Sequence, residues 1–304
     1  MDTKYLEYIL EIAKQKNITR ASEQLYITQS SMSQHLLKLE NELGTALFNR
    51  TKSELTLTDA GQMYVQAAQR VVNIKRTLYS NIAALTNEGS IRLGISSEWG
   101  VQMAADLLPA FQKQYPCVTL KIFEDSFQQL KSMLNSDKID LAVMAAGNPK
   151  ELNLPYELLR QEEIVLAIPS SYPFCAQHAP GSLLLHQKLC TSLRKENFIF
   201  SDEGSTIRLV EDALFHRLLF KPNVICELNS NRATLTMVSK GAGIAFIPAS
   251  YANGIDGVCT YRFDPAVFRS NVLVCRKNLK KTDQENFLMN LIKAYPLFAI
   301  VKTN

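Results

Sequence analysis

Short hydrogen-bonding side chains gather on one face of a helix expected between Thr28 and Gly44. The opposite face carries an apolar stripe of Met32, Leu36, Leu39 and Leu43 at helical spacing. Gln can bond adenine through two hydrogen bonds, Ser reaches bases or phosphates, and a merely solvated face more often carries paired Glu and Lys. The pattern predicts a helix that reads the major groove of double-stranded DNA. Its expected DNA-contacting residues are Thr28, Gln29, Ser30, Ser33, Gln34 and Lys38.

Two cations lie close behind this helix, in a segment that has the pattern of a wing. The polar turn 51–54 separates Leu47 and Phe48 from a stretch, 55–58, in which Leu and Thr alternate as in a short strand. Arg50 and Lys52 are expected near its tip, where they would neutralise phosphates without specifying sequence. For Lys52 alone, an ordinary solvated loop is the alternative.

A second set of polar residues has the arrangement of an anion site. Three short segments follow strands or precede helices, where backbone N–H groups and the positive helix end attract anions. The alternative for Ser126, Ser205 and Thr206 is plain helix capping, and for Arg208 it is a salt bridge to Asp202 or Glu211. The expected effector-binding residues are Ser96, Ser97, Ser126, Gly204, Ser205, Thr206 and Arg208.

Catalytic and metal-binding patterns are missing from the sequence. The four His residues form no constellation with a nucleophile, and there is no GxSxG elbow, P-loop or HExxH motif. The six Cys are scattered without a CxxC pair, as expected of reduced thiols rather than a zinc site. We therefore expect no enzyme activity, no cofactor and no metal.

The elements that position the first polar face are three helices and a wing. We expect helices over 5–16 and 20–25 before the third one, with Asn17 ending the first and Thr19 capping the second. Two helices joined by a few residues favour a helix-turn-helix, and any small helical bundle is the alternative. Residues 1–61 are therefore predicted to form a winged helix-turn-helix DNA-binding domain.

A long helix is expected from Asp59 to about Leu85. At about 1.5 Å per residue it would reach roughly 40 Å, and one apolar seam along it needs a partner. Pairing with a second copy of the chain is the favoured interpretation, and packing on the chain's own C-terminal domain is the alternative. Residues 62–88 are therefore the expected linker and dimerisation helix, with the seam Tyr64, Ala67, Val71, Ile74, Leu78, Ile82 and Leu85.

Beyond the break at 87–90, strands and helices alternate. This alternation predicts a mostly parallel α/β architecture, and two sets of such units suggest two lobes with a cleft between them. We assign residues 89–304 to an effector-binding domain, with lobe I over 89–168 and 266–304 and lobe II over 169–265. Trp99, the only tryptophan, is expected in the cleft wall or in the core.

Bulk composition constrains the compartment more than the function. The net charge is +4, and the first 88 residues carry 10 Lys and Arg against 9 Asp and Glu, so total charge does not indicate a nucleic-acid binder. No apolar run has the length of a membrane span, and the N-terminus lacks the pattern of a secretory signal. We expect a cytoplasmic protein without membrane contact.

Five motifs follow one another in the first 61 residues: NITRASEQL from Asn17, ITQSSMSQ from Ile27, LENELG from Leu39, LFNR from Leu47 and LTDAG from Leu57. This series closely resembles the N-terminal signature of LysR-type transcription regulators, and the match covers the whole domain without gaps. Weaker matches follow at Arg92, Leu108, Tyr115, Asp140 and the GAGIAFIP run at 241–248.

Membership of that family would imply a fold, a function and partners. It implies a two-lobed, periplasmic-binding-protein-like domain with a small-molecule effector between the lobes. It also implies homodimers that assemble into homotetramers on promoter DNA, with RNA polymerase a further candidate partner. The chain departs from the common pattern at Gln34 and Leu37, where many relatives carry basic residues.

Two alternatives to effector control remain at this stage. Peroxide-sensing relatives use a Cys pair in the second lobe, and Cys175 and Cys190 lie near that region. Such thiols need a lowered pKa and exposure, and the apolar run before Cys190 indicates partial burial. The other alternative is a structural DNA-binding protein without effector control. The favoured function is regulated, sequence-specific DNA binding with a small anionic metabolite as effector.

Overall fold

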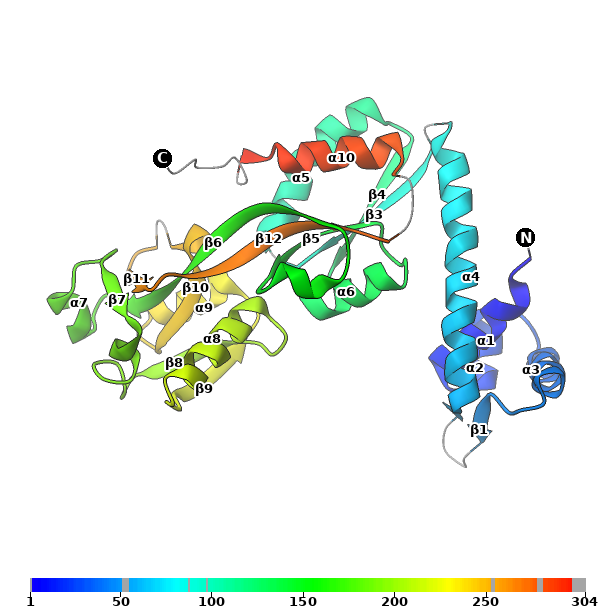
Figure 1. Cartoon of the computed structure of the whole chain (residues 1–304), viewed down its shortest axis with the longest axis horizontal. Helices are drawn as coiled ribbons and strands as arrows, with labels where there is room; N and C mark the ends of the chain where they lie inside the picture. Colours follow the sequence, from blue (N-terminus) through cyan, green and yellow to red (C-terminus); the bar gives the residue numbers. More distant parts are fainter. Residues whose placement is uncertain are drawn as a thin grey trace. The chain divides into compact units, whose positions relative to one another are not determined.

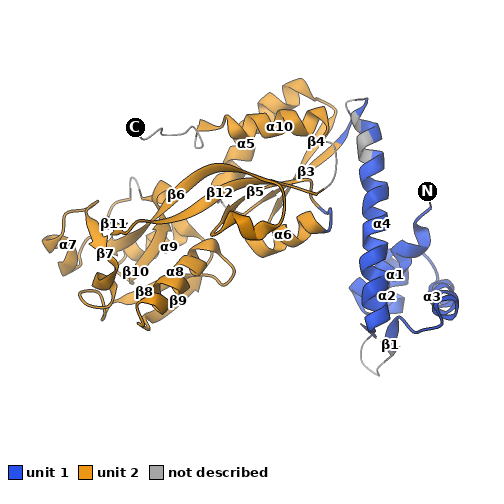
Figure 2. Cartoon of the chain, in the orientation of Figure 1, with its two compact units in different colours: residues 1–89, 136–138 blue, residues 90–135, 139–304 orange. Residues whose placement is uncertain are grey.

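The computed structural model describes residues 2–50, 55–86, 88–96, 98–252, 255–277 and 281–296. They form two compact units, coloured separately in Figure 2. The first unit holds residues 1–89 with 136–138, and the second holds residues 90–135 and 139–304. Lys52 and Ser97, both expected to be binding residues, lie outside the described residues.

The first unit has the expected three helices, two-stranded wing and long helix. Strands β1 and β2 pair antiparallel with Phe48 opposite Leu57. Helix α3 begins after Thr28 and ends at Gly44, whose φ of 68° suits glycine. The elements are α1 (Lys4–Gln15), α2 (Ile18–Gln24), α3 (Gln29–Leu43), β1 (Phe48–Arg50), β2 (Leu55–Leu57) and α4 (Asp59–Ala84).

The start of α2 differs from the prediction. Asn17, not Thr19, is the capping residue, and its side chain accepts a hydrogen bond from the N–H of Arg20 at 3.0 Å. Lys16 takes the left-handed conformation at φ 51° that we had assigned to Asn17. The helix thus begins two residues earlier than expected, because an extended Asn at the N-cap satisfies a free amide and Thr19 is already helical.

One apolar core holds the first unit together. Ile12, Ala21, Met32 and Leu36 are fully buried in it, and residues from the first turns of α4, including Tyr64, pack against it. The base of α4 is therefore part of the same packed domain, and α3 is fixed relative to it.

The second unit contains six helices and ten strands among the described residues. The helices are α5 (Glu98–Gln114), α6 (Phe127–Asn135), α7 (Pro173–Gln177), α8 (Thr206–Arg217), α9 (Asn231–Ser239) and α10 (Asp283–Lys293). The strands are β3 (Gly89–Ile95), β4 (Val118–Glu124), β5 (Leu141–Ala146), β6 (Tyr156–Pro169), β7 (Leu183–Leu185), β8 (Asn197–Ser201), β9 (Asn223–Leu228), β10 (Ile244–Pro248), β11 (Val258–Asp264) and β12 (Val267–Cys275).

Strand directions are mixed rather than mostly parallel. The order β4-β3-β5-β12-β6-β10-β8-β9 is continuous, and β11 pairs with β6 and β7. The βα units give parallel pairs, β3 with β5 and β8 with β9 and β10. Strands β6 and β12 run antiparallel to their neighbours, because each carries the chain from one lobe into the other.

The apolar cores divide the second unit into two lobes. One pair of cores combines residues 91–159 with 272–292, and the other pair combines 164–263 with Val267. The division falls within β6, between Leu159 and Ile164, so Ile164, Leu166 and Ile168 belong to the lobe II core. The expected boundary after residue 168 therefore lies several residues too late.

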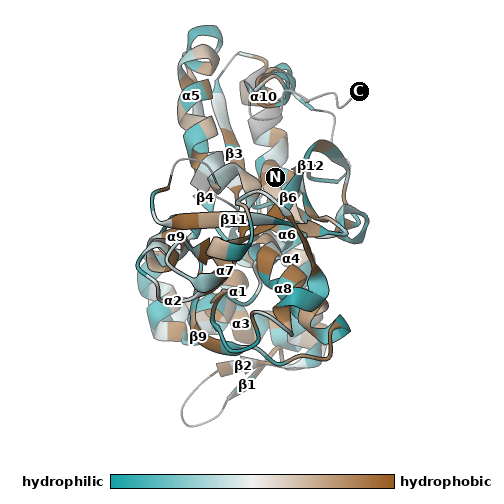
Figure 3. Cartoon of the chain, turned by 90° about the vertical axis from the view of Figure 1, so that its left-hand side faces the viewer, coloured by the Kyte–Doolittle hydropathy of each residue, from teal (hydrophilic) through white to brown (hydrophobic). Residues whose placement is uncertain are grey.

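Helices cover both faces of each lobe (Figure 1). In lobe I, α5 and α10 pack on one face and α6 on the other. In lobe II, α7 and α8 cover one face and α9 the opposite one. Hydropathy colouring shows hydrophilic and hydrophobic residues side by side on α5 and α8, as expected of helices with one buried face (Figure 3).

Candidate DNA-recognition helix and effector pocket

The N-terminal half of α3 presents its polar residues outward. Thr28, Gln29 and Ser30 are exposed, as are Gln34 and Lys38 further along, while Ser33 is half-buried. The stripe on the opposite side, Met32 and Leu36, is fully buried. Thr28 caps α3, and Gln29, Ser30, Ser33 and Gln34 follow in its N-terminal half, the end that enters a major groove in helix-turn-helix proteins, while Lys38 lies further along the helix.

Hydrogen bonds already order this face. The Thr28 hydroxyl accepts the N–H of Ser31 at 3.2 Å and caps the helix. The Gln29 amide donates to the Ser33 hydroxyl at 2.9 Å, so these two side chains are held on adjacent turns. Arg50 ends β1 in the wing. Leu37, one of the two positions at which the sequence departs from the family pattern, is 52% exposed on the same helix.

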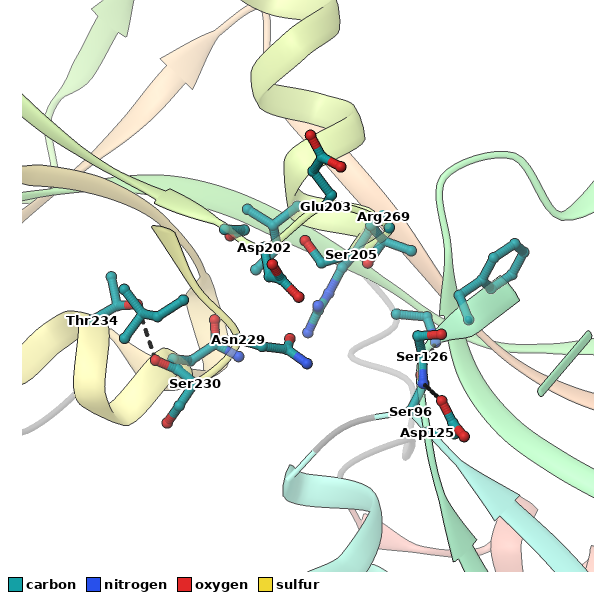
Figure 4. Close-up of a pocket in the computed structure, with 18 of the residues that line it drawn as sticks. Ser96, Asp125, Ser126, Asp202, Glu203, Ser205, Asn229, Ser230, Thr234 and Arg269 are labelled. Atoms are coloured by element: carbon teal, nitrogen blue, oxygen red, sulfur yellow. Dashed lines mark hydrogen bonds between the residues drawn. The ribbon is translucent and has the colours of Figure 1, made fainter. Parts of the chain in front are cut away.

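A pocket of about 410 Å³ opens between the lobes of the second unit (Figure 4). Lobe I supplies the ends of β3, β4 and β5 and the start of α6, while lobe II supplies the segments before α8 and α9. The lining residues are Ser96, Glu124, Asp125, Ser126, Phe127, Ala145, Ser201, Asp202, Glu203, Gly204, Ser205, Thr206, Ile207, Leu228, Asn229, Ser230, Asn231, Thr234 and Arg269.

Three helices begin at this pocket. Their capping hydroxyls belong to Ser126, Ser205 and Ser230, which accept the N–H of Gln129 at 3.3 Å, Arg208 at 3.0 Å and Ala233 at 3.3 Å. The capping alternative thus holds for Ser126 and Ser205. Capping satisfies one amide per helix, and the other first-turn amides have no acceptor within their own helix. Three positive helix ends therefore meet at one cavity.

Arg269 of β12 is the one cationic side chain among the described residues that line the pocket. It is 4% exposed, and its Nε donates to Glu162 Oε2 of β6 at 2.8 Å. Burial by itself would raise the pKa of Glu162, but Arg269 and a hydrogen bond from Ser250 outweigh burial and lower it. Glu162 is therefore ionised, and the pair brings little net charge to the pocket.

The lining also carries four acidic side chains, from Glu124, Asp125, Asp202 and Glu203. Asp125 turns back and accepts the N–H of Ser126 at 2.7 Å. Figure 4 shows the Asp202 carboxylate pointing into the cavity toward Arg269 and Asn229, while Glu203 points away. The pocket thus offers acceptors beside its positive helix ends, and suits a molecule that carries both an anionic group and hydrogen-bond donors.

Most of the residues expected at the pocket line it. Ser96, Ser126, Gly204, Ser205 and Thr206 do so, and the Ser96 hydroxyl also accepts the N–H of Ala145 at 3.0 Å. Residues that the sequence analysis did not select include Asn229, Ser230, Asn231 and Thr234, which share the strand-to-helix pattern and could have been found by it. Arg269 lies near the start of β12, and the residues around it in the sequence show no pattern that indicates a binding site.

Arg208 does not line the pocket, contrary to expectation. Its Nε donates to Asp212 at 3.0 Å, and its Nη1 donates to Glu227 at 3.0 Å and to the carbonyl of Ser201 at 3.2 Å. The guanidinium also lies 5.3 Å from the centre of the Phe200 ring. The predicted partners Asp202 and Glu211 are not those it pairs with. Because Arg208 is absent from the pocket lining and its Nε and Nη1 donate to these groups, we assign it as a supporting residue rather than an effector ligand.

The two cysteines considered as a redox pair, Cys175 and Cys190, both donate hydrogen bonds to backbone carbonyls. Burial raises the pKa of Cys175 to about 11, and its thiol donates to the carbonyl of Pro169, so it lacks the thiolate that attacks peroxide. The Cys190 thiol donates to the carbonyl of Gln187. Among described residues, no group of three His, Cys, Asp or Glu could hold a metal ion.

None of the helices in the described segments combines the length and apolar character needed to cross a bilayer.

Comparison with known proteins matches both units to one family. The bacterial regulatory helix-turn-helix protein model of the lysR family matches residues 3–62, and the LysR substrate binding domain model matches residues 85–294. A probable RuBisCO transcriptional regulator of Trieres chinensis is 30% identical over 253 residues, covering 81% of this chain and 80% of that protein.

Solved structures show the same fold. The LysR family regulator CbnR superposes with a TM-score of 0.63 at 19% identity, covering 96% of this chain and 99% of that chain. CbnR in complex with its target DNA gives a TM-score of 0.60, also at 19% identity, covering 96% of this chain and 98% of that chain.

The fold and the two sites define a DNA-binding transcription regulator that carries an effector-binding domain. The chain belongs to the LysR family of transcription regulators. Members of this family regulate transcription and are not enzymes, in agreement with the lack of a catalytic motif in the sequence.

Proposed function

We propose that this chain regulates transcription through three parts: residues 1–61 read an operator, residues 62–88 pair two copies, and residues 89–304 bind an effector. The effector proposed is a small anionic metabolite that also carries hydrogen-bond donors, such as a hydroxylated carboxylate. The observation that carries this class is the meeting of three helix N-termini at one pocket with Arg269.

The acidic lining narrows the class of anion. A ligand with only negative charge would meet the carboxylate of Asp202 across a small cavity, which costs free energy. Hydroxyl or amino groups on the same ligand would donate to Asp202 and Asn229 and turn that repulsion into hydrogen bonding. An anionic group of the ligand near the helix ends and its donor groups near Asp202 and Asn229 would therefore match both parts of the pocket.

The test is a thermal shift panel on the full chain with matched compounds. Gluconate, hexanoate and sorbitol share a six-carbon chain and differ in charge and hydroxyl content, and each further hydroxy acid is paired with its deoxy and uncharged analogues. We expect hydroxy acids to raise the melting temperature more than either analogue. A panel in which only uncharged or cationic compounds stabilise, or in which none does, would overturn the proposed class.

Two variants test whether the ligand binds in this pocket. Asn229→Ala removes an acceptor and donor from the lining, so it should weaken the response to hydroxy acids. Glu196→Gln, a carboxyl exchange in the same lobe outside the lining, serves as the control. An equal response in both variants would place the ligand elsewhere.

Operator reading is proposed for the exposed face of α3, with Thr28, Gln29, Ser30, Ser33, Gln34 and Lys38, assisted by Arg50 and Lys52 of the wing. Gln29→Ala should reduce discrimination between operator and unrelated DNA, whereas Lys52→Ala should weaken binding to all sequences alike. Competition binding assays at one salt concentration measure both. Unchanged specificity in Gln29→Ala would contradict this placement of the reading face.

Self-association is proposed through the outer seam of α4. Ile74, Leu78, Ile82 and Leu85 are between 48% and 85% exposed in the single chain. Such a row of apolar side chains along one helix is typical of a helix that pairs with another. Dimers, and tetramers built from them, are the proposed assemblies on promoter DNA, with RNA polymerase as a further partner.

A further inference from the structure

The segment that leads into α8 is held by two side chains of α8 itself. Ser201 ends β8, and the next five residues line the proposed effector pocket. Glu211 accepts the N–H of Ser201, with its carboxyl oxygens at 3.1 and 3.3 Å, and Arg208 donates to the carbonyl of Ser201 at 3.2 Å. Both backbone polar groups of Ser201 are therefore bound by one helix.

Arg208 fixes the other end of the segment as well. Its backbone N–H donates to the capping hydroxyl of Ser205 at 3.0 Å, and Ser205 donates its own N–H to the carbonyl of Asp202. Glu227 and Asp212 hold the guanidinium in place at 3.0 Å each. The segment is thus held at Ser205 by the backbone of α8 and at Ser201 by these two side chains, so the position of its Ser201 end depends on where the two side chains lie.

We propose that Glu211 and Arg208 are positioning residues of the effector pocket, which set the 201–206 segment so that its amides and hydroxyls meet a bound anion. This inference rests on the proposed function of the pocket. Neither side chain lines the cavity, so both act through Ser201 rather than on the ligand.

Glu211 also makes the contact that holds Ser201 sensitive to pH. The residue is fully buried, and burial raises the pKa of its carboxyl to about 8. The charges acting on it are Arg208 and Asp212 from α8 and Glu227 from β9. Strands β8 and β10 contain no ionisable side chain, and Arg269 of β12 is paired with Glu162. When Glu211 ionises, a buried negative charge appears behind an anion site.

The first experiment measures amide exchange over residues 200–206 of the full chain, at one fixed pH below 7. Glu211→Ala should speed exchange of the Ser201 amide by about tenfold or more, because its acceptor is lost. Glu211→Gln keeps an acceptor, so its amide exchange should stay near the wild-type rate. Arg208→Ala should speed amide exchange in the 201–206 segment. Glu196→Gln is the matched control and should change nothing here.

The second experiment measures gluconate binding across the pH range around 8, because the gluconate carboxylate stays ionised there. Wild-type affinity should fall roughly threefold to tenfold as Glu211 ionises, and Glu211→Gln should remove this pH dependence. If Glu211 served only to stabilise the fold, Glu211→Gln would lower the affinity for gluconate by the same factor at each pH.

The outcomes separate the two proposals. Unchanged exchange in Glu211→Ala, or the same pH dependence of gluconate binding in Glu211→Gln as in the wild type, would overturn the positioning role. Altered exchange with no gluconate binding by the wild type at any pH would instead contradict the proposed anion site.

Discussion

Gly61, in the first turn of α4, lies directly against the backbone carbonyl of Leu47. A Cβ at residue 61 would be 2.0 Å from that oxygen, far inside any real contact. The same carbonyl accepts the N–H of Thr58 at 3.0 Å, so it cannot easily move away. The contact joins the long helix to the residues that enter the wing, and it requires glycine.

Gly61→Ala should therefore destabilise the DNA-binding unit, although alanine favours helices. We expect a loss of about 1–3 kcal/mol, the usual cost of inserting a methyl group into a packed site. Urea unfolding of the full chain measures it. Gln62→Ala, at an exposed position of the same turn, reports the propensity effect alone. If Gly61→Ala were as stable as Gln62→Ala, the Leu47 carbonyl would have to move away from the added methyl group at little cost in free energy.

Asn17→Ala should destabilise the first unit by about 1 kcal/mol, because the amide of Arg20 loses its acceptor. Thr19→Ala should stay within about 0.5 kcal/mol, as is usual for an exposed helical residue without a capping role. Thermal melting of both variants makes the comparison. Equal losses at the two positions would count against Asn17 as the cap.

Leu78→Asp should dissociate the proposed dimer, since it places a charge in the exposed seam of α4. The dissociation constant should rise by about tenfold or more, as expected when a charge is buried in an apolar interface without a partner. Light scattering over a concentration series gives the mass, and Gln66→Asp, an exposed position off the seam, is the control. If Leu78→Asp keeps the wild-type mass at every concentration, the seam is not the interface.

Glu211 should make stability fall as pH rises. The pKa of its carboxyl is about 8 in the folded chain against an ordinary value of 4.5, so the unfolded chain releases this proton first. Unfolding therefore becomes more favourable between about pH 4.5 and pH 8, and the effect levels off above that range.

Glu211→Gln should remove this component, giving a smaller loss of melting temperature between about pH 5 and pH 8 than the wild type shows, by an amount equivalent to a few kcal/mol. Melting curves at a series of pH values compare the two. Parallel curves for wild type and variant would show that the carboxyl titrates near its ordinary pKa.

Local patterns predicted much of the fold. The apolar stripe of α3, the stop at Gly44 and the length of α4 follow from residues a few positions apart, and so do the caps at Ser126 and Ser205. Neighbouring candidates were harder to separate: Asn17 and Thr19 are both good caps, and only the backbone conformation of Asn17 decides between them.

Features that depend on distant residues were not predicted. Arg208 precedes Glu227 by 19 positions, and nothing in the sequence indicates that strand β9 would bring this carboxylate to it. Arg269 reaches the pocket because β12 runs antiparallel to β6, and strand direction depends on where the chain returns between lobes. The mixed strand directions and the position of Arg269 therefore have one cause: the chain crosses between the lobes twice, in β6 and in β12. We call this the double crossing.

That double crossing limits how the second unit can move. Only β6 and β12 carry the chain between the two cores, and their pairing shifts register between Asn271 and Val272. Two paired strands form a narrow ribbon that resists stretching and shear but twists readily. We therefore expect a change in the angle between the lobes to twist this ribbon. Arg269 and Glu162 are register partners on it, and Arg269 lines the pocket, so such a twist would change the pocket at the same time.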